Sequence, residues 1–326
     1  MLISIYLFAC AVTPSPPPKE PLSAEPPPPA FEPEPFEADI EPPLISPDGV
    51  VMKPCPEQPI SGMSCIEGGA FIRGFDGTHT CEQYENTAQK TQYGPTETLW
   101  LQSYFIDVTE VTFSAYQSCV KAGKCTPAKP RYSDYSRPNQ PMVGVSWHQA
   151  QAYCLAQGKR LPTEAQWEKA ARGTSGAGTP FGSDTVTCQQ AVIKDETGRS
   201  CGVKKEKGSH PEKGRTWEVK GKPVGENQLY DMVGNAEEWV ADWFSPSFEQ
   251  CGTDCLGTDP LGPCQGAEKC SGYRLKMVKG GSWYWSSEHA TAWHRRPHVP
   301  SNDPYHHFGF RCAASLEAAQ KIGTQP

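Results

Sequence analysis

The clearest hydrophobic pattern in the chain lies at residues 146–173 and predicts two consecutive helices. In its first half, Ala150, Tyr153 and Cys154 recur at the spacing of one helical face. Apolar side chains on one face are expected to be buried against the rest of a domain. Pro162 prevents the two helices from continuing into one, because proline removes a backbone donor from a helix interior.

Both helices carry start and stop signals. Ser146 is followed three residues later by Gln149, and Thr163 by Gln166, the spacing of a capping box. In that arrangement each side chain bonds the backbone N–H of the other residue. Gly158 and Gly173 are placed to end the two helices.

The rest of the pattern predicts short strands and little regular structure. Residues 68–75 form a glycine-flanked apolar run, and residues 99–113 are strand-like and lead into a helix that Gly123 ends. After residue 174 the helical pattern fades, and glycine, tryptophan and short β-like runs alternate with turn residues. No repeat of solenoid or propeller period is present. The pattern therefore predicts an α+β fold with much irregular backbone.

Composition changes sharply near residue 60. Residues 1–59 hold 17 of the 33 prolines and carry 9 acidic against 2 basic residues. A segment of this kind buries too little apolar surface to offset the entropy of ordering it. We expect residues 13–60 to be a disordered tether with polyproline character.

The first residues point to the cell envelope. Residues 1–12 are apolar but too short to span a bilayer, and "LFAC" resembles a bacterial lipobox whose cysteine carries the lipid. The sequence therefore predicts a signal segment, a lipid-modified Cys10 and an envelope lipoprotein, either periplasmic or surface-exposed. An uncleaved or mis-started N-terminus is the alternative.

The charge balance argues against nucleic acid as a partner. Residues 60–326 carry 28 acidic and 28 basic residues, so the domain has no basic footprint. The basic run at residues 203–215 lacks interleaved aromatic residues and is interpreted as a solvated loop.

The 14 cysteines indicate an oxidising compartment. Short spacings favour Cys119 with Cys125 and Cys188 with Cys201, while Cys55, Cys65 and Cys81 have no evident partners. The cluster at residues 251–270 favours disulfides, with a zinc site as the alternative. If Cys10 carries a lipid, 13 cysteines remain, so one thiol is free or bonded to another chain.

Four separated blocks resemble one known family. They are "PMVGVSWHQAQAYCLAQGKRLPTEAQWEKAARG", "YDMVGNAEEWVADWF", "KGGSW" and "GFRCA", in this order. The chain resembles the formylglycine-generating enzymes, also called sulfatase-modifying factors. The resemblance implies a single C-type-lectin-like α+β domain over residues 61–316, stapled by disulfides, followed by a tail at residues 317–326.

The resemblance also implies what this chain has lost. Family members oxidise a cysteine in C-x-P-x-R to formylglycine with copper(I) held by two cysteines after the "GGS" block. Those positions correspond here to Trp285 and Ala290, which cannot bind copper, although Ser282 of "GGS" is retained. Copper and the oxidase activity are therefore not expected. A cysteine displaced from the 251–270 cluster is the alternative.

Two structural features are implied by the resemblance. The first is a disulfide between Cys154 and Cys312. The second is a structural calcium site with carboxylates from Asp231 and Glu238 and backbone carbonyls from Gly234 and Ala236. An ordinary acidic turn is the alternative for this loop, which departs from the family by placing Glu237 where an aromatic residue is usual.

Five histidines follow the "GGS" block: His289, His294, His298, His306 and His307. Some relatives of the family are non-haem iron oxidases, but their histidine triad lies on a separate helical domain. We therefore interpret these histidines as polar loop residues, and iron is not expected. A rebuilt histidine metal centre is the alternative.

An aromatic and cationic segment suggests binding. Indole faces and guanidinium forks are suited to stacking and to carboxylate contacts. The expected peptide or glycan groove comprises Trp283, Trp285, Trp293, His294, Arg295 and Arg296. The alternative is that the tryptophans are core residues and the arginines are solvated.

The sequence thus supports three hypotheses. The favoured one is a lipoprotein whose domain lacks the oxidase activity and binds a peptide, protein or glycan, or serves in assembly. The others are an oxidase with a histidine-based metal centre and a formylglycine-generating enzyme with displaced cysteines.

Overall fold

The computed structural model describes residues 44–76, 93–128, 130–204, 213–301 and 306–324. The chain divides into residues 1–42 and a unit of residues 43–326, and only the second is described below. The expected signal segment with Cys10, the tether up to residue 43, and Cys81 lie outside the described residues. Within the described part, no helix has the length and apolar character needed to cross a membrane.

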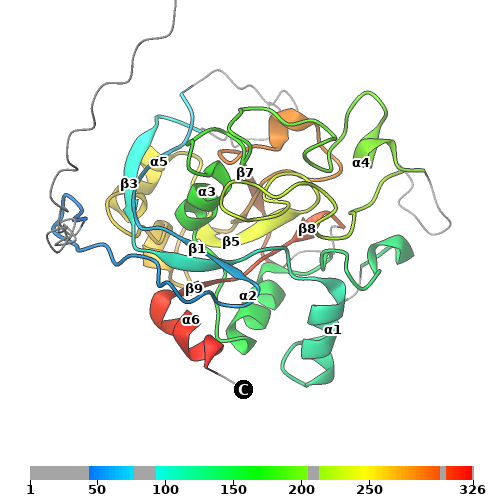
Figure 1. The fold of residues 1–326 in the computed structure, drawn as a ribbon, viewed down its shortest axis with the longest axis horizontal. Helices are drawn as coiled ribbons and strands as arrows, with labels where there is room; N and C mark the ends of the chain where they lie inside the picture. The colour runs from blue at the N-terminus through cyan, green and yellow to red at the C-terminus, as the bar shows by residue number, and fades with distance from the viewer. Residues whose placement is uncertain (1–43, 77–92, 129, 205–212, 302–305, 325–326) are drawn as a thin grey trace, which may run out of the picture. The chain divides into compact units, whose positions relative to one another are not determined.

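The described unit has the expected α+β architecture, with short helices, three small sheets and long irregular connections (Figure 1). One sheet has the order β1-β4-β9 and a second pairs β2 with β3. The third has the order β7-β6-β5-β8, in which β5 runs antiparallel to β6 and parallel to β8. The strands are β1 Met63–Ile66, β2 Gly69–Arg73, β3 Glu97–Leu101, β4 Tyr104–Asp107, β5 Glu237–Trp243, β6 Lys276–Lys279, β7 Arg295–His298, β8 Phe308–Gly309 and β9 Ala313–Ser315.

The helices are short and lie around these sheets. Helix α3 packs on β2, β5 and β6, while α2 contacts α1 and β5 (Figure 1). The α-helices are α1 Phe113–Lys121, α2 Trp147–Ala156, α3 Glu164–Arg172, α4 Arg199–Gly202, α5 Phe248–Cys251 and α6 Leu316–Gly323. Single turns of 3₁₀ helix are η2 Ser133–Tyr135, η3 Gly252–Cys255, η4 Pro263–Gly266 and η5 Ser287–His289.

The two predicted capping boxes are present. Ser146 Oγ accepts from the Gln149 N–H at 3.1 Å, and Gln149 Oε1 accepts from the Ser146 N–H at 3.0 Å. Thr163 and Gln166 make the same reciprocal pair at the start of α3. Local sequence therefore fixes where α2 and α3 begin. The face of α2 that was expected to be buried is buried.

The ordered domain begins earlier in the chain than the predicted boundary at residue 61. Residues 44–60 were assigned to the tether, yet Ile45 bridges Val51 and the Met52 N–H donates to Leu44 O at 2.7 Å. Met52 is buried, and Cys55 is bonded to Cys65 of β1. These contacts satisfy backbone groups and close a short loop, which offsets the ordering entropy that composition alone predicts to be too large.

The expected C-terminal tail also begins with ordered structure. Ser315 caps α6, its side chain accepting from the Ala318 N–H at 3.2 Å. Ala319 is buried in a cluster with Met63, Phe105 and Ala314. Residues 317–323 therefore belong to the domain and cover the β1-β4-β9 sheet.

The domain is stapled by disulfides, as expected. All twelve cysteines of the described residues are paired, including Cys154 with Cys312 as the resemblance implied. The cluster at residues 251–270 forms two short staples, so its sulfurs are not available as zinc thiolates. The pairs are Cys55–Cys65, Cys119–Cys125, Cys154–Cys312, Cys188–Cys201, Cys251–Cys255 and Cys264–Cys270.

We expect the Cys154–Cys312 disulfide to contribute most to stability. It spans 158 residues, whereas Cys119–Cys125 spans 6. Loop-closure entropy favours the longer staple by roughly 3 kcal/mol. The double variant C154A/C312A should therefore lose ~5–10 °C more in Tm than C119A/C125A, as measured by scanning calorimetry. Equal losses in the two variants would contradict the prediction.

Candidate functional site

The "GGS" loop connects β6 to β7 and begins directly after Lys279. Gly280 and Gly281 have φ values of +87° and +67°, a region that favours glycine. A Cβ on Gly280 would lie 2.9 Å from the Trp167 ring, and one on Gly281 would lie 2.5 Å from the His289 carbonyl oxygen. Gly280 is therefore required because Trp167 of α3 packs against it. Gly281 is required because the backbone of the same loop passes close to it at His289.

Ala290 and Trp285 occupy the two positions that correspond to the family's copper-binding cysteines, and both side chains pack against neighbouring residues. Ala290 is fully buried in a cluster with Val186, Ala191, Ile193 and Val233. The Trp285 ring stacks on His289 with a centroid distance of 5.1 Å, and the Arg296 guanidinium lies 5.1 Å from the Trp285 ring. Ser282 is fully buried, and its carbonyl oxygen accepts from the Trp285 N–H at 3.1 Å.

The expected binding groove is mostly interior, which corrects the prediction. Four of its six residues are almost fully buried: Trp283, Trp293, His294 and Arg295. Trp293 stacks on Phe75 with a centroid distance of 4.3 Å, and Trp283 packs against Tyr135 and His306. The tryptophans serve as core here because the surrounding backbone is irregular. Only Trp285 and Arg296 remain partly exposed.

The alternation of strand β7 separates the two arginines. Arg295 points to α3 and pairs with Glu164, while Arg296 donates to Glu237 Oε2 of β5 at 2.6 Å. Neither arginine is simply solvated, so the alternative to a groove holds for Trp283 and Trp293 but not for the arginines. Pro297 is compatible with this strand because β7 lies at the edge of the sheet.

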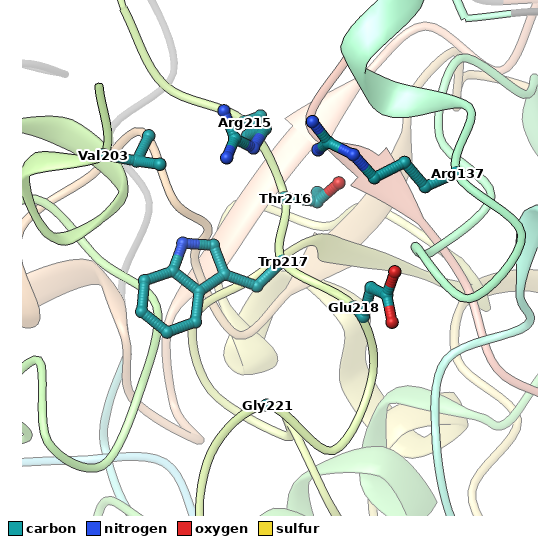
Figure 2. A pocket seen from close by; sticks show the side chains of 7 residues that line it. All are labelled: Arg137, Val203, Arg215, Thr216, Trp217, Glu218 and Gly221. Carbon is teal, nitrogen blue, oxygen red and sulfur yellow. The ribbon is translucent and has the colours of Figure 1, made fainter. Parts of the chain in front are cut away.

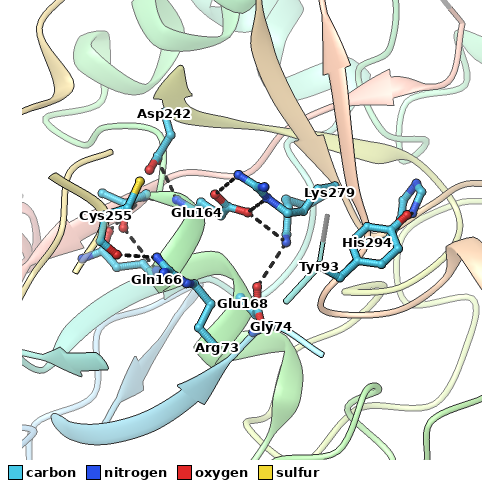
Figure 3. Close-up of polar contacts among 12 residues, drawn as sticks. Arg73, Gly74, Tyr93, Glu164, Gln166, Glu168, Asp242, Cys255, Lys279 and His294 are labelled. Atoms are coloured by element: carbon cyan, nitrogen blue, oxygen red, sulfur yellow. Dashed lines mark hydrogen bonds and ion pairs between the residues drawn. The ribbon is translucent and has the colours of Figure 1, made fainter. Parts of the chain in front are cut away.

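A buried ion network lies between α3 and the central sheet (Figure 3). Glu164 accepts from Arg295 Nε at 2.6 Å and lies 3.5 Å from Lys279 Nζ. Glu168 lies 3.2 Å from Lys279 Nζ and 3.0 Å from Arg172 Nη2, and it also accepts from the Gly74 N–H at 2.7 Å. All of these charged side chains are buried, so each depends on its partners.

Charge pairing and burial move the pKa values of the network's carboxyls in opposite directions. Burial alone would raise the pKa of Glu164, but Arg295 and Lys279 outweigh it and lower the value to about 2. The Oδ2 of Asp242 accepts from the Glu164 N–H at 2.7 Å, and Lys276 and Arg295 lower the pKa of Asp242 by less than burial raises it. Its burial and the neighbouring Glu164 carboxylate raise its pKa to about 7.

The expected calcium set does not fit the arrangement of Glu238. Both oxygens of Glu238 accept from Arg311, at 2.7–3.0 Å, and Oε2 also accepts from Trp167 Nε1 at 2.7 Å. A calcium ion would have to displace Arg311 from this carboxylate. Without Glu238 the set retains one carboxylate and two carbonyls, too few hard oxygens for calcium.

The remaining acids beside Arg311 have their own partners or are held neutral. Asp231 Oδ2 accepts from the Lys220 N–H at 2.9 Å, and burial raises its pKa to about 6. Burial and the nearby Asp231 and Glu238 raise the pKa of Glu110 well above its usual range. In this arrangement Arg311 is the cation that neutralises Glu238, and Asp231 and Glu110 are buried acids beside it.

The histidines do not converge on one centre. His289 and His294 are neighbours, and Tyr93 OH lies 3.1 Å from His294 Nδ1. Burial lowers the pKa of His289 to about 4 and that of His294 well below its usual range, so both are neutral at pH 7. His306 and His307 lie beside Trp283, and His298 packs on Trp239. Among the residues described, no three His, Cys, Asp or Glu side chains are placed to hold a metal ion together.

Sequence reasoning missed the buried ion network. Glu164, Glu168 and Lys279 carry no local mark of burial, because charged residues on short helices and strands are usually exposed. It also missed Asn235 of the "GNAEEW" block. Its side chain accepts from the Trp217 N–H at 2.9 Å and donates to Glu110 at 3.0 Å, while its carbonyl accepts from the Trp283 N–H at 3.0 Å.

The fold and the "GGS" loop together define a domain of the formylglycine-generating-enzyme type. The model of the sulfatase-modifying factor enzyme 1-like domain matches residues 49–316, and the chain belongs to this family.

Relatives carry different names. The chain is 28% identical over 289 residues to the serine/threonine-protein kinase pkn1 of Chlamydia caviae, a match covering 80% of this chain and 39% of that protein. It is 33% identical over 199 residues to the formylglycine-generating enzyme of Thermomonospora curvata, covering 58% of this chain and 60% of that enzyme. The chain therefore spans less than two thirds of the length of these relatives.

Among solved structures, PvdO from Pseudomonas aeruginosa has the same fold. It superposes with a TM-score of 0.59 at 24% identity, covering 78% of this chain and 94% of that one.

The raised pKa of Asp242 predicts a pH dependence of stability. Folded Asp242 binds its proton more tightly than the unfolded residue, so its stabilising contribution is complete below pH ~4 and lost as the pH rises through about 7. D242N keeps an acceptor for Glu164 N–H without the charge. Compared with the unmodified protein, it should gain on the order of 2–4 kcal/mol between pH 4 and pH 8. Urea unfolding across this range measures the gain. E249Q, at an exposed position of α5, is the control, and a pH-independent difference for D242N would contradict the prediction.

The partners of Glu238 predict that stability does not depend on calcium. Because Arg311 and Trp167 already satisfy its oxygens, EDTA should leave the Tm of the purified protein unchanged within ~1 °C. Thermal unfolding with EDTA, with added Ca²⁺ and with added Mg²⁺ checks this. A drop of several degrees in EDTA that Ca²⁺ alone restores would show that calcium displaces Arg311.

Proposed function

We propose that this chain is an extracytoplasmic, lipid-anchored binding module built on a formylglycine-generating-enzyme scaffold without its copper chemistry. The observation that carries the proposal is the packing at the two expected thiol positions. Trp285 is stacked on His289, and Ala290 is enclosed by apolar side chains. Neither residue offers a soft ligand for copper(I).

The cysteines elsewhere support the loss of the oxidase. Each of the twelve described cysteines is in a disulfide, so none of them supplies the thiolate that copper binding and cysteine redox chemistry require. A displaced cysteine would have to come from the cluster at residues 251–270. All four cysteines of that cluster are in the disulfides Cys251–Cys255 and Cys264–Cys270.

The same disulfides and the N-terminal sequence support the proposed location of the protein. Six disulfides persist in an oxidising compartment and are rare in the cytosol. The "LFAC" segment followed by a proline-rich tether supports a lipid on Cys10 and a domain held away from the membrane.

Similar domains occur in relatives that carry other names. The matching stretch makes up 39% of a protein named as a serine/threonine-protein kinase, so similar domains are not confined to proteins named for formylglycine formation. A rigid, disulfide-stapled scaffold with irregular loops is also suited to presenting side chains to a ligand.

The test is an oxidase assay with a metal measurement. The purified full chain, given copper(I), oxygen and a thiol reductant, should convert none of a C-x-P-x-R peptide to formylglycine and should retain no stoichiometric copper. Mass spectrometry of the peptide and elemental analysis of the protein measure both, with the Thermomonospora curvata enzyme as positive control. Peptide conversion, or one copper per chain, would refute the proposal. Intact-mass measurement of membrane-extracted protein tests for the lipid on Cys10.

A further inference from the structure

A small cavity lies where β3 turns into β4, beside the start of α3 and the loop at residues 259–261. Its volume is about 220 Å³. Sites for drug-sized ligands occupy roughly 300–1,000 Å³, so this cavity is suited to a smaller molecule. The lining residues are Leu101, Gln102, Ser103, Tyr104, Arg160, Thr163, Gln166, Asp259, Pro260, Leu261 and Ser315.

A larger cavity of about 480 Å³ surrounds Trp217 (Figure 2), but its recognition groups are used within the domain. Lys222 Nζ lies 4.3 Å from the centre of the Trp217 ring and covers that face. The guanidinium groups of Arg137 and Arg215 donate to backbone carbonyls. The smaller cavity differs because charged atoms at its wall remain available to a ligand.

Arg160 offers the edge of its guanidinium that binds carboxylates. Its Nη1 donates to the carbonyl oxygen of the next residue at 3.0 Å. Its Nε and Nη2 are not enclosed, and neither has a hydrogen-bond partner in the described part of the chain. Arg295 and Arg311 use these same two nitrogens to bind Glu164 and Glu238 in the interior. Arg160 therefore has the donor pair for a carboxylate that the described residues do not supply.

Asp259 lines the same cavity and has one available carboxylate oxygen. Its Oδ1 accepts from the Gln102 N–H at 2.9 Å, whereas Oδ2 has no hydrogen-bond partner among the residues that the structure describes. Burial lowers the pKa of Arg160 and raises that of Asp259, and each charge partly offsets the shift of the other. No printed contact of the described residues joins the two as an ion pair. Opposite charges that share a cavity without touching are suited to a molecule placed between them.

The surroundings of Asp259 favour a ligand that brings its own cation. Lys169 is the other cation that acts on Asp259, but its ammonium donates to Gly69 O at 3.0 Å. The apolar residues Pro260 and Leu261 directly follow Asp259, and Leu261 is 41% exposed. They provide a short apolar wall, which suits a small side chain beside a charged group.

The walls of the cavity are fixed by backbone bonds. The Asp259 N–H donates to Trp100 O at 2.7 Å, and Arg160 exchanges two backbone bonds with Ala313, at 2.7 and 2.9 Å. Gln166 is held by the capping box of α3, and its Nε2, which has no partner within the described residues, is a further donor. Walls fixed in this way lose little freedom when a ligand binds, which favours affinity.

We propose that this cavity binds a free α-amino acid with a small side chain. The ligand carboxylate lies on the Nε–Nη2 edge of Arg160, its ammonium group donates to Asp259 Oδ2, and its side chain lies against Leu261. The proposal rests on the proposed binding function and names a ligand class for it.

The first test is calorimetric titration of the purified full chain with glycine, L-alanine and L-serine. We expect at least one of them to bind. N-acetyl-L-alanine lacks the ammonium group and L-alaninamide lacks the carboxylate. Each should bind about tenfold or more weakly than L-alanine, because each loses charge-assisted hydrogen bonds.

Two variants assign the two ends of the ligand. R160Q should weaken L-alanine binding about tenfold or more and should no longer distinguish L-alanine from L-alaninamide. D259N keeps an acceptor for the Gln102 N–H, and it should no longer distinguish L-alanine from N-acetyl-L-alanine. R131Q and E249Q, at exposed positions outside the cavity lining, are the matched controls and should bind as the unmodified protein does.

Several outcomes would overturn the proposal. If none of the three amino acids binds the unmodified protein, water alone fills the cavity. Equal binding of N-acetyl-L-alanine or L-alaninamide would indicate a peptide end instead of a free amino acid. Unchanged discrimination in R160Q and D259N would place the ligand elsewhere, and Tm values equal to that of the unmodified protein exclude misfolding as the cause of a loss. The oxidase and copper measurements do not depend on this cavity, so the two proposals fail separately.

Discussion

The packing of α3 on the central sheet depends on the compensation of charges buried between them. Lys279 of β6 and Arg295 of β7 are directly opposite each other in the register, an arrangement of like charges that is unfavourable by itself. Glu164 contacts both cations, and Glu168 joins Lys279 to Arg172. Because removing one member leaves an uncompensated charge in the interior, these elements are bound to one arrangement. The "GGS" loop begins one residue after Lys279, so its course is set by this network.

The "GGS" loop keeps a tightly determined course although Trp285 and Ala290 occupy the positions that correspond to the family's cysteines. The two glycines remain necessary because Trp167 and His289 approach them too closely for any side chain. The positions expected to hold copper ligands are instead packed by an indole and a methyl group. Asn235 connects this loop to the segment at Trp217, because it accepts hydrogen bonds from the backbone N–H groups of both Trp283 and Trp217.

The local features that were predicted correctly depend on interactions between residues that are close together in the sequence. The capping boxes at Ser146 and Thr163 are read from residues three positions apart, and the four blocks of the family pattern gave the fold. Burial of charge was not predictable in this way, because Arg295, the partner of Glu164, lies 131 residues away in the sequence. The same limit explains the predicted groove. Trp283, Trp293 and His294 resemble a binding surface in one dimension, and only their distant contacts with Tyr135, Phe75 and Tyr93 make them interior residues. Residues 44–60 were assigned to the tether because their prolines and low apolar content do not reveal the disulfide and backbone bonds that order them.

The disulfide between Cys154 and Cys312 has a consequence for how the protein behaves when a protease cuts it. It encloses residues 155–311, which include the central sheet and nearly all the long irregular connections. A protease that cuts any one of those connections leaves two pieces that are still covalently joined. Both cysteines are fully buried, so reductants reach the bond only after unfolding. Nicked molecules would therefore persist as intact particles and separate only on a reducing gel.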